Sequence, residues 1–570
     1  MDVAQMLTWT AERYPHRHGV GGPVPLTYRA WDARTNQLAR ALAGLGVRPR
    51  ERVAFLLSGG EPMASLHLAV QKRGAVSVPL SIRFGPAELS HCLADASPRL
   101  LVTDGATAGL VGDAVDQVPH PPVRAHLAPP PGSTGGTPAA SPDGAASPDG
   151  AAPLDRLAAA EPDGALPAAV PPLREDDLSV MLYTSGTTGR PKGVPRTHRA
   201  EHTAAVAHVI QTQQRPGEVT LGVMPMFHTM GLRSLLASII VGGTWVPQAR
   251  FGAVEALELI TGYSVTSLYL VPTMYWSLLH TGRLPEAASV TRLAYAGAAM
   301  TPSLAGDLTE ALRPEVFVNH FGSTEIYTFT THPDAAGKPG CAGRAGVFSR
   351  VRLVDPTPGA PPDALVGPGE QGQVAVSMHS PEAFGGYWHR PDADAKSIRG
   401  GWYFPGDLAV ADEDGDLWVS GRVDDMIVSG GENIYPGEIE DALARCPAVA
   451  DVVVAGLPDD RWGHAVTAFI VPRDGLAPGR ALAEVDGFVR DGSGLPSLKR
   501  PKRLVAVERI PTSAVGKILR RELTDGRFTA LAERPGRRPD RESDQKPDQK
   551  PDQEPAQNRA QEPAGDREAR

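Results

Sequence analysis

One segment of the chain combines residue types that bind phosphate. Residues 181–194 read MLYTSGTTGRPKGV. Small residues let backbone N–H groups converge on an anion, and hydroxyl groups add further donors. Lys192 supplies a compact positive charge. We therefore expect a phosphate-binding loop formed by Thr184, Ser185, Gly186, Thr187, Thr188, Gly189 and Lys192.

The spacing of this loop differs from that of the common P-loop, which requires G-x-x-x-x-G-K-[ST]. Here Lys192 follows Pro191 and precedes Gly193. Proline has no backbone N–H and disfavours helix at the residue before it, so the loop should not lead directly into a helix. The segment 179–184 favours a strand, which places the loop at a carboxyl end, where open α/β sheets bind ligands. From composition alone, the alternative interpretation is an ordinary surface loop rich in Gly and Thr.

The elements around the loop follow a repeating pattern. Short β-branched runs alternate with helical patterns, which is typical of βαβ units and parallel sheets. We expect strands at 52–57, 75–80, 265–272, 291–297 and 315–322, and a helix at 61–74. The fold class predicted is α/β, with a large N-terminal domain of βαβ subdomains over residues 1–421.

The pattern changes late in the chain. Residues 415–431 favour a hairpin, 435–447 an amphipathic helix, and 449–458 and 465–472 two strands. We therefore expect a hinge at 422–424 and a smaller, mobile α+β domain over 425–530.

Two stretches are low in complexity. Residues 119–172 are rich in Ala, Pro, Gly and Asp, and residues 531–570 are polar and repetitive. Segments this poor in large apolar residues cannot offset their ordering entropy. We expect a surface insertion in the first and a disordered tail in the second.

Composition sets broad limits on the class of protein. At 570 residues, at least two domains are expected. The net charge of −9 gives no sign of nucleic acid as a partner. Cys92, Cys341 and Cys446 are too widely spaced for a zinc site or a disulfide framework. The N-terminus lacks a signal-like apolar core and no run is long enough for a membrane span, so we expect a cytoplasmic protein.

The phosphate-binding segment resembles the corresponding loop of the adenylate-forming (AMP-binding) superfamily. Further motifs occur in the family's order: FGSTE at 321–325, WYFPGD at 402–407, GRVDDMIVSGGENIYPGEIE at 421–440 and PTSAVGKILRREL at 511–523. The resemblance covers roughly positions 1–530 and is specific to the acyl-CoA synthetase branch. It implies that a carboxylate attacks the α-phosphate of ATP, forming an acyl-adenylate and pyrophosphate, and that a thiol then displaces AMP.

The resemblance assigns roles to residues around the nucleotide. The loop would bind the β- and γ-phosphates, Glu325 and Thr188 would bind Mg²⁺, and Thr324 would contact the α-phosphate. Asp407 would accept hydrogen bonds from the ribose with help from Arg422. The family's Tyr at 321 is Phe321 here, and its Thr at 405 is Pro405, so both hydroxyls are missing. Other expected ATP or AMP contacts are Gly297, Ala298, His320, Gly322 and Lys517.

Lys517 resembles the family's catalytic lysine, which reaches both the attacking carboxylate and the α-phosphate. Asp424 occupies the hinge about which the C-terminal domain rotates between the two half-reactions. Gly430 and Gly431 would line the tunnel of the CoA pantetheine, although a tight turn also explains both glycines.

The acid pocket is assigned to Phe227, His228, Ala296 and Gly297, with Ala294 and Ala298 as further small residues. Amino-acid-activating relatives usually carry Asp where His228 stands, so a plain carboxylic acid is expected, and His228 is counted with Lys517, Glu325 and Lys192 as catalytic. A buried core histidine remains the alternative. Small residues favour a ring over a long chain.

Four residues resemble those that hold CoA in the aromatic-acid ligases: Arg83, Trp462, Arg500 and Lys502. Arginine suits phosphate and adenine because it pairs bidentately and stacks. The alternative for 498–503 is a solvated basic turn.

The function predicted is an ATP-dependent acid–CoA ligase for an aromatic or heteroaromatic acid such as benzoate, a halobenzoate or 2-furoate, using ATP, Mg²⁺ and coenzyme A. Alternatives are a medium- or long-chain fatty acid–CoA ligase, a stand-alone adenylation enzyme that loads a carrier protein, and a non-catalytic nucleotide-binding protein. The expected partners are small molecules: a carboxylic acid, ATP and CoA. The sequence is also compatible with a homodimer.

Overall fold

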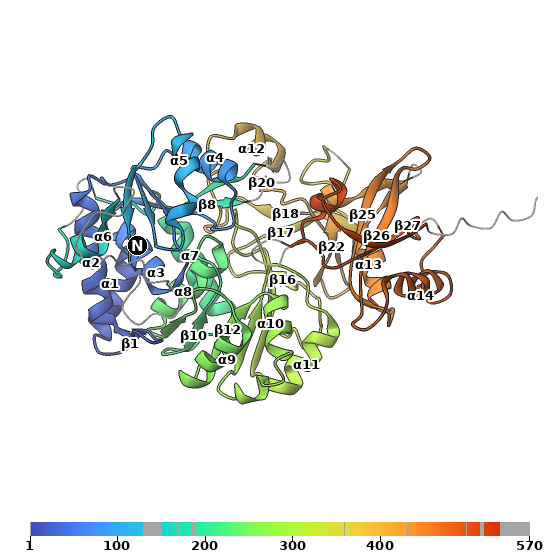
Figure 1. Ribbon diagram of the computed structural model, residues 1–570, viewed down its shortest axis with the longest axis horizontal. Coiled ribbons are helices and arrows are strands. Elements are labelled where there is room, and N and C mark those ends of the chain that lie inside the picture. Colours follow the sequence, from blue (N-terminus) through green and yellow to red (C-terminus); the bar gives the residue numbers. More distant parts are fainter. Residues whose placement is uncertain are drawn as a thin grey trace, which may run out of the picture.

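A computed structural model describes residues 2–128, 151–167, 172–184, 190–357, 359–429, 432–497, 499–512 and 518–535. Within these residues the strands form four sheets. Three belong to a large N-terminal domain and one to a smaller C-terminal domain, which Figure 1 shows in orange and red at the right. The predicted α/β class, with mostly parallel N-terminal sheets, is confirmed. No helix among the described residues is long and apolar enough to cross a membrane.

The first sheet has a parallel body and one antiparallel edge. Its strands, in spatial order, are β7 (Ala152–Pro153), β6 (Val123–His126), β5 (Leu100–Thr103), β3 (Arg52–Leu56), β4 (Val76–Pro79), β8 (Leu178–Thr184) and β9 (Lys192–Thr197). Only β9, among the described strands of this sheet, runs antiparallel to its neighbour.

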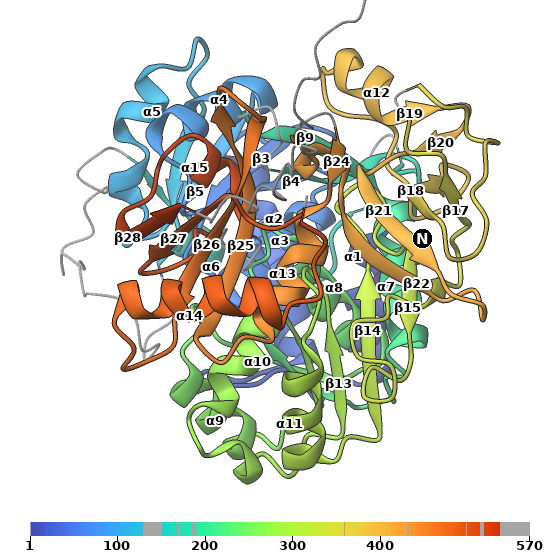
Figure 2. The ribbon, with the colours of Figure 1, turned by 90° about the vertical axis from the view of Figure 1, so that its right-hand side faces the viewer.

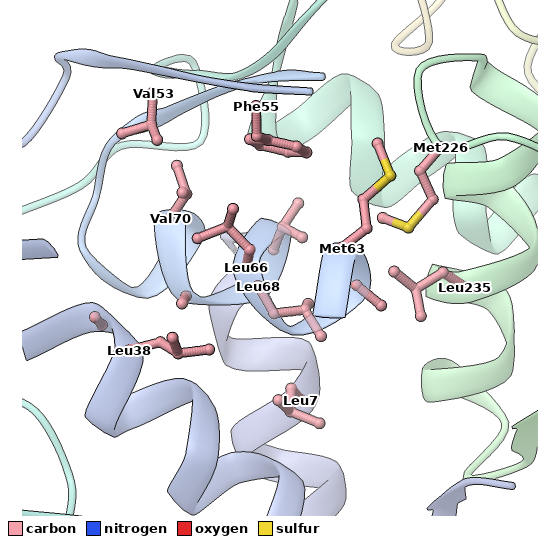
Figure 3. Packing of buried hydrophobic residues seen from close by; sticks show 14 of the residues in the cluster. Leu7, Leu38, Val53, Phe55, Met63, Leu66, Leu68, Val70, Met226 and Leu235 are labelled. Carbon is pink, nitrogen blue, oxygen red and sulfur yellow. The ribbon is translucent and has the colours of Figure 1, made fainter. Parts of the chain in front are cut away.

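Helices cover both faces of this sheet because side chains alternate along each strand. Val53 and Phe55 face one core, which Figure 3 shows packed on helix α3. Ala54 and Leu56 face a second core. The helices of this region are α1 (Val3–Arg13), α2 (Tyr28–Gly44), α3 (Gly60–Lys72), α4 (Pro86–Ala96), α5 (Gly112–Asp116) and α6 (Leu154–Ala159), with a 3-10 turn at Ala108–Leu110.

The second sheet is also mainly parallel. Its order is β16 (Arg344–Ala345), β15 (Thr330–His332), β14 (Val316–Phe321), β13 (Arg292–Tyr295), β12 (Ser267–Leu270), β10 (Val219–Gly222), β11 (Thr244–Pro247), β1 (His18–Val20) and β2 (Leu26–Thr27). One face packs on α9 (Ala253–Gly262), α10 (Pro272–Leu279), α11 (Pro302–Leu312) and the 3-10 turn Leu284–Glu286. The other face packs on α7 (His198–Gln211) and α8 (Thr229–Ile240), which also contribute to the core of the first sheet.

The third sheet is antiparallel and completes the N-terminal domain. It contains β17 (Val351–Val354), β18 (Gln371–Ser377), β19 (Ile398–Arg399), β20 (Trp402–Tyr403), β21 (Asp407–Ala411) and β22 (Leu417–Arg422), with helix α12 (Pro391–Ser397) beside it.

The C-terminal domain is α+β. Its sheet contains β23 (Ile427–Ser429), β24 (Glu432–Ile434), β25 (Val449–Asp459), β26 (Gly463–Pro472), β27 (Arg503–Val507) and β28 (Ala530–Pro535). Its helices are α13 (Pro436–Ala444), α14 (Pro478–Asp491) and α15 (Arg520–Thr524). Figure 2 looks onto this domain, with α14 and β25–β28 in front of the N-terminal domain.

Three expectations need correction. The hairpin predicted at 415–431 does not form: β22 pairs with β21, whereas β23 pairs with β24 and β26 in another sheet. The interval 119–172, expected as a surface insertion, contains β6, β7 and α6, which extend the first sheet. The expected tail at 531–570 begins too early, because β28 pairs with β27 up to Pro535. Residues 129–150 and 536–570 lie outside the described residues.

Candidate active site

A cavity of about 780 Å³ lies where the carboxyl ends of several parallel strands meet the third sheet. Segments that follow β10, β13 and β14 all contribute to it, which is the usual ligand position in open α/β sheets. Most of the site residues expected from sequence line it: Arg83, Thr184, Lys192, Phe227, His228, Ala296, Gly297, Ala298, His320, Phe321, Gly322, Thr324, Glu325, Asp407, Arg422 and Asp424.

The segment expected to bind phosphate joins two antiparallel strands. Thr184 at the end of β8 pairs with Lys192 at the start of β9, so a strand follows the loop, and the prediction that no helix follows it directly is confirmed. The loop residues Ser185, Gly186, Thr187, Thr188 and Gly189 lie outside the described residues.

Tyr387 connects the lysine to the expected metal ligand. Its hydroxyl donates to Glu325 Oε1 at 2.7 Å, and the Lys192 Nζ lies 4.2 Å from its ring centroid. Burial lowers the pKa of Lys192, while the nearby Glu325 carboxylate acts in the opposite direction. Sequence reasoning missed Tyr387, because a contact between positions 325 and 387 leaves no local pattern.

The turn after β14 depends on a glycine. A Cβ on Gly322 would lie 1.8 Å from the carbonyl oxygen of Tyr327, so a larger residue requires the backbone to move. The turn places Thr324 and Glu325 against the cavity, both nearly buried. Phe321 packs edge-to-face on Phe329, with the ring centroids 5.1 Å apart.

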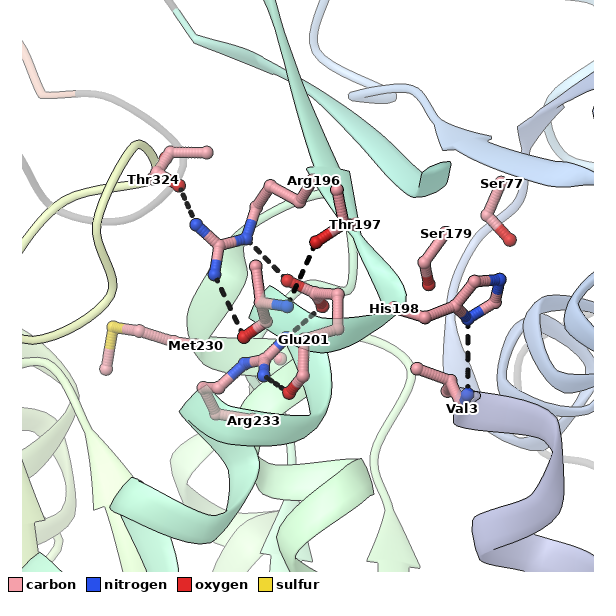
Figure 4. A network of polar contacts seen from close by, with 12 residues as sticks. Val3, Ser77, Ser179, Arg196, Thr197, His198, Glu201, Met230, Arg233 and Thr324 are labelled. Atoms are coloured by element: carbon pink, nitrogen blue, oxygen red, sulfur yellow. Dashed lines mark hydrogen bonds and ion pairs between the residues drawn. The ribbon is translucent and has the colours of Figure 1, made fainter. Parts of the chain in front are cut away.

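A buried ionic network supports this turn from behind (Figure 4). Arg196 donates through Nη1 to the carbonyl oxygens of Thr324 (2.8 Å) and Glu325 (3.2 Å), and through Nε to Glu201 Oε1 (2.5 Å). Arg233 binds the other carboxylate oxygen of Glu201. Burial alone would raise the pKa of Glu201, but the two guanidinium groups lower it, so the carboxylate is ionised at neutral pH. Nothing local in the sequence indicated this network.

Asp407 and Arg422 form a pair across the third sheet. They are register partners on β21 and β22, and Arg422 Nη1 lies 2.6 Å from Asp407 Oδ1. Arg422 also donates through Nη2 to the carbonyl oxygen of Pro405 at 2.8 Å.

The expected acid pocket lies at the start of α8 and the end of β13. His228 is the N-cap residue of α8, half-buried, and its Nδ1 accepts from the Met230 N–H at 3.3 Å. Phe227, Ala296 and Gly297 line the same cavity. Ala294 does not line the cavity, and it packs in a buried cluster with side chains of β12 and β14.

The hinge region borders both the small cavity and a larger cleft. The cleft, of about 1990 Å³, lies between the two domains and shares Asp424, Arg422 and Leu519 with the cavity. Asp424 belongs to the 3-10 turn Val423–Asp425. The expected catalytic Lys517 and the tunnel glycines Gly430 and Gly431 lie outside the described residues.

Arg520 ties the segment after Lys517 to the start of the C-terminal domain. Its guanidinium lies 2.9 Å from Asp425 Oδ2 and 2.6 Å from Glu440 Oε2. It also donates through Nε to the carbonyl oxygen of Val454 at 3.3 Å. All three partners belong to the beginning of this domain.

The four expected CoA residues divide between the two domains in this arrangement. On the C-terminal domain, Lys502 Nζ lies 5.3 Å from the Trp462 ring centroid, and Arg500 donates to the Leu495 carbonyl oxygen at 3.1 Å. These three residues line neither the cavity nor the cleft. Arg83 is exposed at the edge of the cavity on the N-terminal domain.

Comparison with known proteins identifies the class of this site. The model of the AMP-binding enzyme family matches residues 7–388, and that of the AMP-binding enzyme C-terminal domain matches residues 438–517. The chain therefore belongs to the AMP-binding enzymes. It is an AMP-forming acid–thiol ligase of the acyl-CoA synthetase type, for which ATP and CoA are substrates.

Individual relatives cover nearly the whole chain. A feruloyl-CoA synthase of Amycolatopsis is 34% identical over 90% of this chain and 96% of its own length. The long-chain-fatty-acid–CoA ligase FadD13 of Mycobacterium tuberculosis is 32% identical over 88% and 93%. The crystal structure of the anthranilate CoA ligase AuaEII with anthranoyl-AMP superposes with a TM-score of 0.81 at 25% identity, covering 92% of this chain and 97% of that one.

Proposed function

We propose that this ligase joins an aromatic or heteroaromatic carboxylic acid to CoA, with ATP bound through Mg²⁺. The observation that carries the proposal is that one cavity collects groups from every nucleotide motif together with the expected acid pocket. Tyr387 contacts both Lys192, through its ring, and Glu325, through its hydroxyl group. Asp407 forms an ion pair with Arg422 in the same cavity.

In the first half-reaction, Lys192 and the loop residues before it bind the β- and γ-phosphates, which leave as pyrophosphate. Asp407 holds the ribose hydroxyls, and Phe321 offers its ring to adenine. Glu325, a buried carboxylate with hard oxygen ligands, fits Mg²⁺, with Thr188 as a second ligand. When bound, that ion neutralises charge on the phosphates. Lys517 stabilises the charge that develops as the acid carboxylate attacks the α-phosphate.

In the second half-reaction, the C-terminal domain rotates about Asp424 and Lys517 leaves the site. The CoA thiol then attacks the acyl carbon along the tunnel lined by Gly430 and Gly431, and AMP departs. Arg83, Trp462, Arg500 and Lys502 bind the CoA nucleotide once rotation has brought the two domains together. The pair of Trp462 and Lys502 already provides an aromatic face beside a cation.

An aromatic acid is supported by the small residues Ala296 and Gly297 beside His228 and Phe227. Position 228 holds a histidine and not the Asp that would pair with the ammonium group of an amino acid, so amino acids are disfavoured as substrates. Two relatives also point this way, since their names specify feruloyl and anthranilate substrates. The similarity to a long-chain-fatty-acid–CoA ligase favours fatty acids as the second candidate.

The test is pyrophosphate release with benzoate, 2-furoate, octanoate and amino acids, each with and without CoA. We expect release with aromatic acids and thioester formation only when CoA is present. Release that does not depend on any acid contradicts the proposal, and loading of a carrier protein without turnover of free CoA would shift it to the carrier-loading class. In Lys517→Ala, adenylation should collapse while thioester formation from supplied acyl-adenylate survives.

A further inference from the structure

The inner wall of the acid pocket consists of two tyrosines. Tyr269 and Tyr327 line the 780 Å³ cavity, and each side chain is 1% exposed, whereas His228 at the entrance is half-buried. Tyr269 is the register partner of Ala294 on β13. Because residues two apart share a face of a strand, Tyr269 lies on the same side of the sheet as Ala296. Tyr269 therefore lies on the Ala296 side of the cavity, and Tyr327 lies beside it in the same buried cluster.

The tyrosine hydroxyl groups belong to a chain of buried polar contacts. The Tyr327 hydroxyl donates to the Tyr269 hydroxyl at 3.0 Å and contacts His208 Nδ1 at 2.8 Å. The Tyr269 hydroxyl contacts His320 Nδ1 at 3.4 Å. His320 Nε2 contacts the Thr328 hydroxyl at 3.2 Å.

This chain leaves a position for a hydrogen-bond donor. A tyrosine hydroxyl donates one hydrogen bond and accepts up to two. Since Tyr327 donates to Tyr269, it accepts from His208, and its remaining lone pair is unused by these contacts. A ligand O–H or N–H can donate to that lone pair, whereas an ether oxygen or a halogen cannot.

The wall is electrically neutral. Burial lowers the pKa of His320 to about 3 and the pKa of His208 well below its usual value, so both imidazoles are uncharged at neutral pH. The guanidinium carbon of Arg233 lies 5.4 Å from the Tyr327 ring centroid, but this arginine is bound to Glu201. A second carboxylate on the substrate would be buried here without a counter-ion, which is costly.

The wall also closes the pocket. The rings of His208 and Tyr269 lie 4.7 Å apart, and those of His320 and Tyr327 lie 4.3 Å apart. Buried apolar side chains from α7, α8 and β14 pack behind them. A long alkyl chain would have to displace this packed group.

We propose that Tyr327 and Tyr269 select a ring-sized acid that carries an uncharged hydrogen-bond donor, such as a phenolic hydroxyl, at the end far from the carboxylate. This inference rests on the proposed function of an aromatic acid–CoA ligase and specifies its substrate class. It excludes both long-chain acids and ring dicarboxylates.

The first test compares kcat/KM for pyrophosphate release among matched acids: benzoate, 3- and 4-hydroxybenzoate, 4-methoxybenzoate, terephthalate and decanoate, with cinnamate and 4-hydroxycinnamate as a longer pair. At least one hydroxy acid should exceed its unsubstituted parent by about tenfold, as one net hydrogen bond allows. The methoxy acid, terephthalate and decanoate should each fall below benzoate. Equal values for every hydroxy acid and its parent would overturn the inference.

The second test uses Tyr327→Phe and Tyr269→Phe and reads the ratio of the hydroxy acid to its parent. The ratio should fall to about one in Tyr327→Phe. Tyr275→Phe is the matched control, because Tyr275 is equally buried, donates to the carbonyl oxygens of Leu268 and Ala294, and does not line the cavity. Its ratio should equal that of the unmodified enzyme.

The outcomes separate the two proposals. If no aromatic acid releases pyrophosphate, the proposed function fails. If aromatic acids are activated but Tyr327→Phe and Tyr269→Phe lower all of them equally, the tyrosines have only a structural role and this inference alone fails.

Discussion

Glu201→Gln tests the buried network behind the active-site turn. The carboxylate of Glu201 is 1% exposed, and the two guanidinium groups bound to it, from Arg196 and Arg233, are fully buried. The substitution keeps the size of the side chain but removes the charge that both cations share. Removing one partner of a buried ion pair costs about 3–5 kcal/mol, because an unpaired charge stays buried. We expect a loss in this range.

Thermal unfolding measures the loss directly. For a domain of this size, 1 kcal/mol corresponds to about 1 °C, so Glu201→Gln should lower the apparent unfolding temperature by about 3–5 °C. Glu286→Gln is the matched control: it removes the same charge from a pair with Arg283 whose side chains are 44% and 48% exposed. Such surface pairs contribute about 0–1 kcal/mol. The reasoning is refuted if the two variants unfold within 1 °C of each other.

The same variant has a functional readout. Arg196 donates to the carbonyl oxygens of Thr324 and Glu325, so its release from Glu201 should loosen the turn that carries the expected metal ligand. We expect the KM for ATP, measured by pyrophosphate release, to be higher in Glu201→Gln than in the unmodified enzyme. The KM of Glu286→Gln should be unchanged.

Three further predictions concern single positions. Gly322→Ala places a methyl group 1.8 Å from the Tyr327 carbonyl oxygen, so the turn must move by more than about 1 Å, and adenylation should fall by about 100-fold in pyrophosphate release. Asp407→Asn removes the charge opposite Arg422 and the proposed ribose acceptor, so KM for ATP should rise by about tenfold while KM for the acid stays constant. Burial raises the pKa of Glu382 to about 7 from 4.5, so its contribution to stability is lost as pH rises through that interval; in Glu382→Gln, unfolding temperatures should decline less than in the unmodified enzyme between pH 5 and pH 8.

Each of these has a result that contradicts it. Gly306→Ala in α11 adds a methyl group in open space and should leave adenylation unchanged, so equal losses in Gly306→Ala and Gly322→Ala would exclude the steric argument. A raised KM for the acid in Asp407→Asn would contradict the role of Asp407 as the ribose acceptor. Parallel pH curves for Glu382→Gln and the unmodified enzyme would show that this carboxyl does not titrate in that range.

Local sequence patterns predicted the parallel strands of the N-terminal domain well. The proline at 191 indicated that no helix follows the loop directly, and the strand β9 begins at Lys192. Motif residues far apart in sequence meet in one cavity, in part because the segments around Phe227, Ala296 and Gly322 follow the carboxyl ends of neighbouring parallel strands. These features depend on short-range backbone preferences, which a single segment carries by itself.

Pairing partners were not predictable in the same way. The segment 415–431 contains two strands, as expected, but the 3-10 turn Val423–Asp425 directs them into different sheets. Alternation of side chains does not specify which strand lies next to which. Likewise β28 has no buried apolar face, and it is held by backbone pairing with β27 and by Arg534 bound to Asp486.

The low-complexity flanks were misjudged for a related reason. Around residue 160 the backbone carbonyl oxygens help to hold the segment in place, together with the buried side chains of Leu154 and Ala158. Arg40 donates to the carbonyl oxygens of Pro162 and Ala165, and Asn36 to that of Asp163. Composition measures side chains, so it underestimates order that comes from backbone acceptors.

The contacts of Arg520 have a consequence for the mechanics of the enzyme. They bind the segment around Arg520 to Asp425 and Glu440, near the proposed hinge. These parts of the C-terminal domain must therefore rotate as one rigid body. In the proposed rotation, the displacement of Lys517 then depends on the angle through which the domain turns at Asp424. A single glycine inserted after Asp424 would lengthen the proposed hinge segment. It should misplace Lys517 without altering any residue that contacts a substrate.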